Sequence, residues 1–376
     1  MTASLQAKDY ESGSVLYMSM ELSDKTWRLA FGDGAHQGQV GIESADIAGL
    51  SEQVDRAKRK WGLAEPVRVV SCYEAGRDGF WLHHQLAQLG IENRVVDAAS
   101  IEVARRARRA KTDRLDAQAL LEKLIRYEHG ERRVWRVVRV PTPEWEDLRQ
   151  LHRERGQLLS EQTRHRNRLS SKLIAQGLRL APDGRFLQRL EQAKLFDGRP
   201  LPEHLKAGLK REWARLQVVG AQQLKAVEGS IRALIKDSEP LKAVRLLMLL
   251  TGVGWVGAWM LVLEVFGWRE MANRRQLASL CGLVPSPYNS GTQVRDQGIS
   301  KAGNRRVRAL MIQLAWLWLR YQPGSKHSRW FQERFGGGGK RQRRIGIVAL
   351  ARRLLIDLWR FVEAGVVPEG ARLKLG

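Results

Sequence analysis

The stretch Lys111-Thr-Asp-Arg-Leu-Asp-Ala117 follows a run of arginines and carries two acidic residues three positions apart. On a helix, residues at this spacing project from one face. Two carboxylates held that close repel each other, and a cation between them relieves the repulsion. A simpler interpretation is also open, because acidic residues are favoured in the first turn of a helix, where Thr112 would be the N-cap. The stretch therefore predicts either a metal-binding pair, Asp113 and Asp116, or an ordinary helix start.

The composition indicates a soluble globular protein with a polyanionic partner. The chain has 376 residues, of which 43% are hydrophobic and 28% charged, enough for two or three domains. Its 64 lysines and arginines against 40 acidic residues give a net charge of +24, which favours nucleic acid as the partner. No lipidation motif indicates a membrane partner. Two cysteines cannot form a disulfide framework, so we expect a reducing, cytoplasmic location.

Residues 14–128 have the pattern of an α/β domain. Three candidate strands come first, at 15–20, 26–31 and 39–42. Helical and strand-like segments then alternate, with helices at 47–61, at 80–89 and from 101 onward, and strands at 67–72 and 94–96. Leading strands followed by alternation with helices are typical of an α/β domain.

Two further acidic residues are expected at the carboxyl ends of strands. Glu21 directly follows the first strand, and Glu74 follows the strand at 67–72. The carboxyl ends of strands in an α/β sheet face the crevice where ligands bind. Together with Asp113 and Asp116 on a later helix, they form the set of carboxylates that a two-metal phosphoryl-transfer site needs. Oxygen ligands select Mg²⁺ or Mn²⁺ over zinc, so this order favours the metal-binding interpretation.

The region 129–240 has the pattern of long helices. Leucines near heptad spacing stand in a charged background at Leu148, Leu151, Leu158, Leu169 and Leu173. A second apolar series follows at Leu224, Val227, Ile231 and Leu234. We predict two helices with coiled-coil seams, joined through 182–202, although Arg155 and His165 interrupt the first seam. The region is either a structural hairpin or an arm for dimerisation or nucleic-acid contact.

Residues 241–376 are predicted to form a helical domain with irregular loops. The stretch Leu250-Thr-Gly-Val-Gly-Trp-Val-Gly-Ala258 has the shape of a helix-hairpin-helix turn. In such a turn Gly252 and Gly254 would expose backbone N–H groups to a phosphate. The alternative is a glycine-rich turn between core helices. The loop 280–291 contains Ser290, which by itself is a turn residue before Gly291.

Three groups of basic residues are expected to contact nucleic-acid phosphates. They are Arg105, Arg106, Arg108, Arg109, Lys111 and Arg114 beside the aspartates, Lys301, Arg305, Arg306 and Arg308 after the loop, and Lys340, Arg341, Arg343 and Arg344 before an amphipathic helix at 345–362. Such contacts are largely independent of sequence and strongly dependent on salt. For the first group, a solvated helix face is the alternative. Ser300 is a candidate cap for a helix that starts at Lys301.

Several motifs, taken together and in this order, resemble the insertion-sequence transposases of the IS-one-ten family, kin to the Piv/MooV pilin-gene inversion recombinases. They are Tyr17-Met-Ser-Met-Glu-Leu-Ser-Asp-Lys-Thr-Trp27, Val70-Ser-Cys-Tyr-Glu-Ala-Gly76, Lys111–Ala117, Leu250-Thr-Gly-Val-Gly254, 280–291, Ile299-Ser-Lys-Ala-Gly-Asn304 and Ala349-Leu-Ala-Arg-Arg-Leu-Leu355. The motifs span nearly the whole chain. Each is weak alone, and the set is specific.

The resemblance implies an N-terminal RuvC-like domain of the RNase H fold, a coiled-coil middle and a C-terminal transposase domain. By matching positions, a DEDD metal tetrad would be Glu21, Glu74, Asp113 and Asp116, and a nucleophilic serine would be Ser290. The resemblance also implies a structured bridge RNA that pairs with target and donor DNA. It further implies a homo-oligomer, a dimer or tetramer, whose subunits share the active site.

One position departs from the family pattern, which usually has aspartate where this chain has Glu21. The extra methylene moves the carboxylate outward by about 1.5 Å, so metal preference could shift. Asp24 is the alternative ligand, although it is expected in a turn. Two other functions stay open: a junction-resolving metal nuclease in which water attacks, and a nucleic-acid-binding protein without catalytic activity.

Overall fold

The computed structural model of the chain describes residues 14–102, 112–290 and 293–374. These residues form two compact units that divide between Val140 and Pro141. Within the described ranges, no helix is both long and apolar enough to cross a membrane.

The first unit is built on a mixed five-stranded sheet. Its strands follow the spatial order β3-β2-β1-β4-β5, with β1 (Val15–Glu21), β2 (Thr26–Gly32), β3 (Gln37–Glu43), β4 (Arg68–Glu74) and β5 (Glu92–Val96). β1, β2 and β3 pair antiparallel through tight turns, whereas β1, β4 and β5 pair parallel. The predicted α/β class is confirmed, and the strand order is consistent with a RuvC-like fold.

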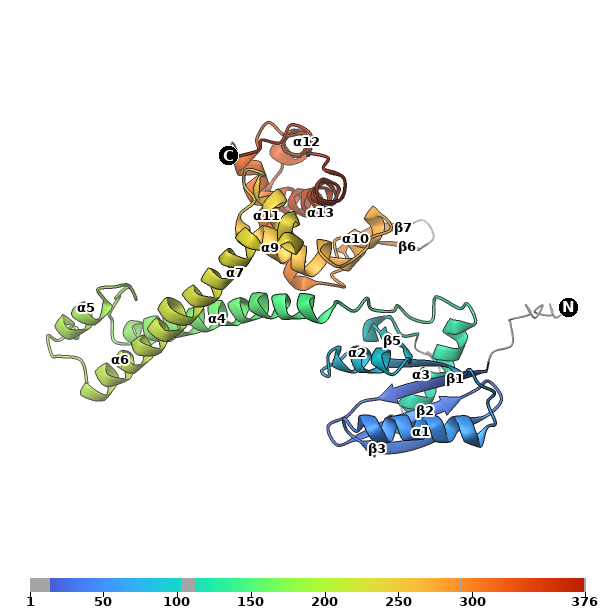
Figure 1. Ribbon diagram of the computed structural model, residues 1–376. Coiled ribbons are helices and arrows are strands. Elements are labelled where there is room, and N and C mark those ends of the chain that lie inside the picture. The colour runs from blue at the N-terminus through green and yellow to red at the C-terminus, as the bar shows by residue number, and fades with distance from the viewer. Residues whose placement is uncertain (1–13, 103–111, 291–292, 375–376) are drawn as a thin grey trace. The chain divides into compact units, whose positions relative to one another are not determined.

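Helices cover both faces of this sheet (Figure 1). α1 (Ile47–Lys60) and α2 (Trp81–Gln88) pack on the face that carries Leu16 and Met18, and α3 (Asp113–Glu128) packs on the face that carries Tyr17. Residues 101 and 102 were expected to be helical and are not; a short 3₁₀ turn, η1 (Ala98–Ser100), precedes them.

The first unit extends past residue 128, the predicted end of the α/β domain. Val137 forms a bridge with Val96, and the Val138 N–H donates to Val95 O at 2.7 Å. Trp135 is buried against the α3 side of the sheet. The segment 129–140 therefore belongs to the sheet domain, because it pairs back onto β5.

The second unit begins with a helical arm, in which α4 runs alongside α6 and α7 (Figure 1). The elements are α4 (Pro143–Ile174), α5 (Phe186–Gln192), α6 (Glu203–Gln217), the π-helical η2 (Val218–Leu224) and α7 (Lys225–Asp237). The two residues that interrupted the predicted seam are paired across it: Arg155 with Glu228 at 2.8 Å, and His165 with Glu212 at 2.8 Å. The long helices are confirmed, but a regular coiled coil is not shown.

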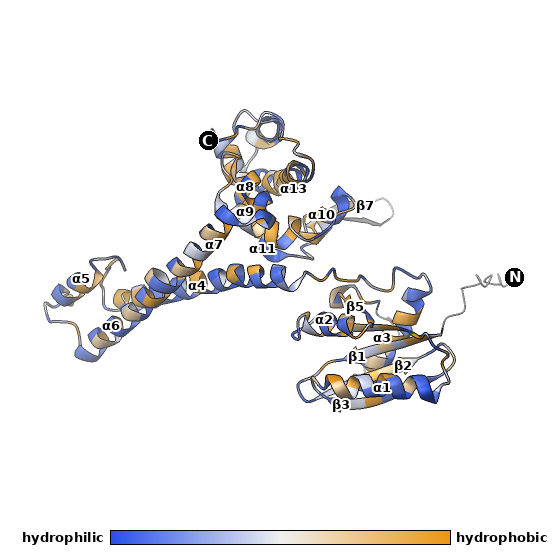
Figure 2. Cartoon of the chain, viewed as in Figure 1, coloured by the Kyte–Doolittle hydropathy of each residue, from blue (hydrophilic) through white to orange (hydrophobic). Residues whose placement is uncertain are grey.

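The rest of the second unit is a helical body with one β-hairpin. Its elements are η3 (Glu239–Leu241), α8 (Lys242–Met248), α9 (Trp255–Leu261), the π-helical η4 (Val262–Phe266), α10 (Arg274–Leu280), β6 (Pro285–Ser290), β7 (Gln293–Ile299), α11 (Arg305–Tyr321), α12 (Lys326–Phe331), η5 (Gln332–Gly336) and α13 (Lys340–Ala364). Apolar and hydrophilic residues are mixed along the helices of this body and along α4 (Figure 2). The body's core includes the buried Trp259, Trp318 and Leu354.

Three local predictions in the second unit were wrong. The segment expected as an irregular loop forms the β6–β7 hairpin, which tolerates Pro285 and Pro287 because a register irregularity separates them. The α11 helix is capped by Asn304, not Ser300, because the Asn304 side chain accepts hydrogen bonds from two backbone N–H groups of the first turn. The α13 helix begins at Lys340, so the cations expected before it form its first turn.

Candidate active site and nucleic-acid interface

Glu21 and Glu74 end two adjacent parallel strands. Where β1 pairs with β4, the last partners are Met20 and Tyr73, and each glutamate is the next residue along its strand. Side chains alternate along a strand, and those of Tyr17 on β1 and of Cys72 on β4 pack toward α3. Glu21 and Glu74 are in phase with them. Both glutamates therefore belong to the face of the sheet that α3 covers.

The α3 helix runs antiparallel to β1. The Ser19 Oγ, at the middle of β1, donates a hydrogen bond to Ala117 O at 2.6 Å. One helical turn later, Leu121 packs against Gly32, where an added Cβ would lie 3.4 Å from a Leu121 methyl. Gly32 is the cross-strand partner of Tyr17. As α3 runs toward its C-terminus, it therefore passes over β1 from the C-terminal end of the strand toward its N-terminal end.

This direction places the first turn of α3 over the end of β1. Four helical residues advance about 6 Å, and two strand residues advance a similar distance. One turn before Ala117 is Asp113, and two residues after Ser19 is Glu21. Asp113 therefore begins its helix above the strand end that carries Glu21, and Asp116 shares this turn.

The helix start is itself an ordinary one. Thr112 is the N-cap, and its side chain accepts a hydrogen bond from the Leu115 N–H at 3.3 Å. The two interpretations of the sequence are therefore compatible. Asp113 and Asp116 occupy a capped first turn, and that turn lies at the carboxyl end of the sheet.

The four carboxylates fit a hard divalent cation in their chemistry, since all the donors are oxygens. Asp113 and Glu74 are exposed, and Glu21 and Asp116 are partly buried. Within the described ranges, no three acidic, histidine or cysteine side chains are close enough to hold a metal ion. The backbone positions of the four residues lie at one edge of the sheet, but their carboxylates are not close enough together to coordinate one metal ion.

The alternative ligand, Asp24, is engaged elsewhere. It lies in the turn between β1 and β2 and forms an ion pair with Arg77 at 2.5 Å. Both side chains are exposed, so the pair contributes little to stability. Its position in the turn, as expected, favours Glu21 over Asp24 as the residue at the strand end.

One basic residue beside the carboxylates was missed in the sequence. Arg28 is the cross-strand partner of Glu21, so the two share a face of the sheet. Arg28 and Arg114 line a polar cavity of about 500 Å³, together with Gln37, Gly38, Gln39 and Gln118. Within the described residues, neither arginine forms an ion pair with an acid, so both are available to a phosphate. The alternation along this strand could have revealed the position of Arg28, because Arg28 lies between the buried Trp27 and Leu29 and so belongs to the other face of the sheet.

Ser290 is the last residue of β6 and lies opposite Gln293 near the end of the hairpin. Side-chain positions from 287 to 297 lie outside what the structure describes. Ser290 belongs to the second unit, whereas the four carboxylates belong to the first. Three other serines lie near Ser290 in the sequence: Ser279 in α10, Ser286 in β6, and Ser300 directly after β7.

A close backbone crossing fixes the base of the hairpin. Gly282 and Gly303 both have positive φ, +64° and +90°. A Cβ on Gly282 would lie 2.0 Å from Ala302 O, and a Cβ on Gly303 would lie 2.2 Å from Leu280 O. The Asn304 N–H also donates to Leu280 O at 2.7 Å. Two of the sequence motifs, 280–291 and 299–304, are therefore the two sides of one glycine crossing.

Comparison with known proteins agrees with these motifs. Residues 40–175 match the family model of DEDD-type IS110 transposases, and residues 244–329 match the model described as "Transposase IS116/IS110/IS902 family". A putative transposase of Sinorhizobium fredii, y4rJ, is 43% identical over 96% of this chain and 94% of its own length. The chain belongs to the IS110 family of transposases. It is an enzyme that cuts and recombines DNA.

More distant relatives are transposases as well. A second putative transposase of Sinorhizobium fredii, y4qE, is 30% identical over 78% of this chain and 69% of its own length. The transposase for insertion sequence IS1328 of Yersinia enterocolitica is 24% identical over 85% of this chain and 91% of its own length. The family match therefore extends over both compact units of this IS110 transposase.

The glycine turn of this transposase has a structural explanation. Helix α8 ends just before this turn, and helix α9 begins just after it. Gly252 has a φ of +90°, and a Cβ there would lie 3.2 Å from the Tyr321 Cβ. The Gln322 Nε2 donates to Thr251 O at 2.9 Å. These contacts explain by packing why position 252 is a glycine. Gly254 is exposed. Phosphate contact by either glycine stays a prediction.

The expected phosphate contacts of the transposase fall into four structural settings. Arg305 and Arg306 begin α11, and Lys340 and Arg343 lie in the first turn of α13, all exposed. Arg114 lies in α3, and Arg105, Arg106, Arg108, Arg109 and Lys111 lie outside the described residues. Lys301, Arg308, Arg341 and Arg344 line one large cleft. Arg308 has a structural role too, because its guanidinium donates to Lys301 O at 2.8 Å.

A buried polar cluster was not anticipated. Glu264, 3% exposed within η4, accepts hydrogen bonds from Arg149 at 3.3 Å and from the Asn304 Nδ2 at 3.0 Å. The neighbouring His152 is also buried, and burial lowers its pKa to about 4. Asn304 caps α11, so the cluster joins α4 to the glycine crossing of the transposase. The sequence could have indicated a buried acid here, because Glu264 lies in an otherwise apolar run.

Proposed function

We propose that this IS110 transposase cleaves and exchanges DNA strands at a divalent-metal site formed by Glu21, Glu74, Asp113 and Asp116. The observation that carries the proposal is the antiparallel course of α3 over β1, which brings the acidic helix start to the glutamate-bearing strand ends. Mg²⁺ or Mn²⁺ bound there would stabilise negative charge on the oxygens of the scissile phosphate. The domain is then RuvC-like.

Ser290 is the proposed nucleophile. Its Oγ forms a bond to the scissile phosphorus while the bond from phosphorus to one strand oxygen breaks, and the leaving oxygen takes up a proton. The hydroxyl of the incoming strand then attacks the phosphoserine, which releases the serine and regenerates the phosphodiester. The number of phosphate ester bonds is conserved, so strand exchange needs no separate energy source. A serine hydroxyl requires activation for this step. We assign the activation to the carboxylate edge, which is the end of the sheet that carries Glu21, Glu74, Asp113 and Asp116.

The two parts of the site lie on different compact units. The proposed reaction therefore needs the hairpin of one unit to reach the sheet edge of another, within one chain or between copies. We propose a homo-oligomer, a dimer or tetramer, and the helical arm from α4 to α7 is its candidate contact. The exposed apolar side chain of Ile174, 53% exposed at the end of α4, supports this role for the arm.

A structured RNA is proposed to select the DNA sites. The net charge of +24 and the exposed cations of α11 and α13 suit backbone recognition, which carries little sequence information. If base pairing with an RNA reads the sequence, the protein needs to recognise only backbone and duplex shape. Purification from cells carrying the insertion element, followed by sequencing of the bound RNA, tests this point. Recovery of no element-derived RNA would contradict it.

Metal dependence is tested with the complete enzyme, its RNA and both DNA partners. Asp113→Asn and Glu21→Gln are expected to lose strand cleavage in Mg²⁺ and Mn²⁺ by at least about 100-fold while keeping DNA affinity, because they remove metal ligands. Glu122→Gln, on the exposed side of α3, is the matched control and should cleave normally. Equal cleavage by Asp113→Asn and the control would overturn the assignment of the site.

A further inference from the structure

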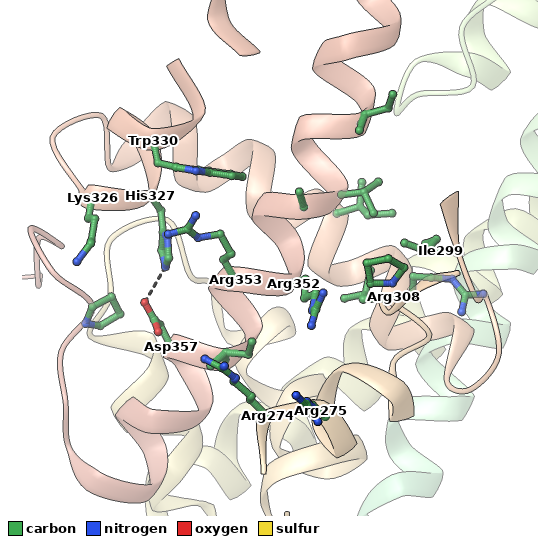
Figure 3. Close-up of a pocket in the computed structure, with 18 of the residues that line it drawn as sticks. Arg274, Arg275, Ile299, Arg308, Lys326, His327, Trp330, Arg352, Arg353 and Asp357 are labelled. Carbon is green, nitrogen blue, oxygen red and sulfur yellow. Dashed lines mark hydrogen bonds and ion pairs between the residues drawn. The ribbon is translucent and has the colours of Figure 1, made fainter. Parts of the chain in front are cut away.

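The second unit contains a cleft of about 1600 Å³ bounded by α10, the base of the β6–β7 hairpin, α11, α12 and α13. Ten of its lining residues are lysine or arginine and two are acidic. Both acids are already paired. Asp357 lies 2.7 Å from the His327 Nε2 (Figure 3), and Glu369 lies 2.5 Å from the Lys326 Nζ. The cleft therefore presents an excess of positive charge that its own acids do not neutralise.

Most of the cations in the cleft have no acidic partner. Within the described residues, eight of them form no ion pair: Arg274, Arg275, Lys301, Arg308, Arg341, Arg344, Arg352 and Arg353. They come from three separate segments of the chain, and Figure 3 shows Arg274, Arg275 and Arg352 along the same opening. Unpaired cations that converge on one cleft indicate an anionic ligand with several charges.

Part of the remaining lining is apolar and exposed to solvent. Ile345 is 56% exposed, Val366 is 57% exposed and Val367 is 41% exposed, although all three are large aliphatic residues. Trp330 also lines the cleft, with the Arg353 guanidinium 4.2 Å from its ring centroid. A ligand that covers this surface needs flat or apolar groups as well as negative charges.

A paired duplex offers mainly phosphates to a surface of this kind, because its base faces are stacked inside the helix. An unpaired strand offers both phosphates and free base faces, and proteins bind such strands by combining cationic grooves with stacking platforms. Arg344 and Arg352 are eight residues apart on α13, about 12 Å along the helix, so they can contact different phosphates.

We propose that this cleft binds an unpaired nucleic-acid strand, with its phosphates on Arg344 and Arg352 and its bases over Ile345 and Val366. The strand comes either from RNA or from opened DNA, since both share this chemistry. The inference rests on the enzyme's action on nucleic acid and is independent of the proposed metal site. An acidic protein segment fits the charges but does not need the Arg353–Trp330 stack.

The test measures binding by fluorescence anisotropy with the full-length protein in EDTA, so that a failure of the metal site does not affect it. The probes are a 12-nucleotide thymidine strand, a 12-nucleotide uridine strand and a 12-base-pair duplex. Ile345→Ser and Val366→Ser are each expected to weaken single-strand binding at least fivefold and duplex binding less than twofold. Leu89→Ser, which alters an exposed apolar residue of the first unit, should change neither.

The cations are tested through salt dependence. Arg352→Gln is expected to reduce the slope of log K against log salt by about 0.7 for the single strands, and Arg211→Gln, exposed on α6, should leave it unchanged. Tighter binding of the uridine strand would identify RNA as the source, and tighter binding of thymidine would identify DNA. Equal losses for strand and duplex in Ile345→Ser, or tighter binding of a 12-residue polyglutamate than of either strand, would overturn the proposal.

Discussion

The Ser19 Oγ donates a hydrogen bond of 2.6 Å to Ala117 O, and both residues are fully buried between β1 and α3. This contact sets the height of α3 over the sheet and thereby the position of the acidic first turn. The bond is local in space but joins residues far apart in sequence. It is the structural link between the strand that carries Glu21 and the helix that begins at Asp113.

Removing this bond should loosen the site. Ser19→Ala is expected to lower the free energy of unfolding by about 1 kcal/mol, the usual contribution of one buried hydrogen bond, and to reduce metal-dependent cleavage. Urea unfolding and cleavage rates measure the two effects. Ser160→Ala, at an exposed position of α4, is the control and should change stability by less than about 0.5 kcal/mol. Unchanged cleavage in Ser19→Ala would show that this contact does not position the carboxylates.

Arg28 should hold a phosphate next to the carboxylate edge. Arg28→Gln is expected to raise KM about tenfold with a smaller effect on kcat, because it removes binding to a non-reacting phosphate. A substrate with one uncharged methylphosphonate at the contacted position should lose affinity with the native enzyme but show no further loss with Arg28→Gln. Arg56→Gln, exposed on α1 at the opposite face, is the control. Equal losses for the two variants would contradict the assignment.

The glycine crossing at the hairpin base should tolerate no side chain. Gly282→Ala and Gly303→Ala each combine a positive φ with a Cβ placed against backbone oxygen, so each should destabilise the second unit by more than about 2 kcal/mol. Thermal unfolding measures the change. Gly229→Ala, within α7 and with open space around its Cα, should be neutral or stabilising. A stable Gly303→Ala protein would show that the crossing can open.

His152 should make the transposase sensitive to mild acid. Burial lowers its pKa from 6.5 to about 4, so the folded state binds its proton later than the unfolded state does as the pH falls. Its contribution to stability is fully present above pH 6.5 and is lost toward pH 4; at pH 4.5 the loss is about 2–3 kcal/mol. Unfolding free energies at pH 7 and 4.5 measure it. His152→Gln should show a smaller loss between these pH values, and an equal loss would contradict the prediction.

Much of the first unit could be predicted from sequence because its signals are local. β1, β2 and β4 are short apolar runs between turn residues, and α1 repeats apolar residues at helical spacing. Glu21 and Glu74 could be placed at strand ends for the same reason. Arg28 was missed because its importance comes from pairing opposite Glu21, which depends on the register of β2.

The second unit was harder to predict because its key contacts are nonlocal. Pro285 and Pro287 indicated a loop, but the partner strand β7 pairs with them across the turn. Ser300 looked like a helix cap, whereas the glycine crossing at Gly303 delays the helix until Asn304 can cap it. The cleft gathers residues from α10, β6, β7, α11, α12 and α13, and only the spacing of Arg344 and Arg352 along α13 hinted at it.

The central claim is that Ser290 forms a covalent link to DNA with the help of the carboxylate edge. The most direct measurement is a denaturing gel of the complete reaction with labelled DNA, its RNA and Mg²⁺, followed by mass spectrometry of the shifted band. We predict a DNA–protein adduct at Ser290 that is absent in Ser290→Ala and in Asp113→Asn, and present in Ser286→Ala and Glu122→Gln. Cleavage without any adduct would indicate attack by water, and an adduct that persists in Ser290→Ala would contradict the account.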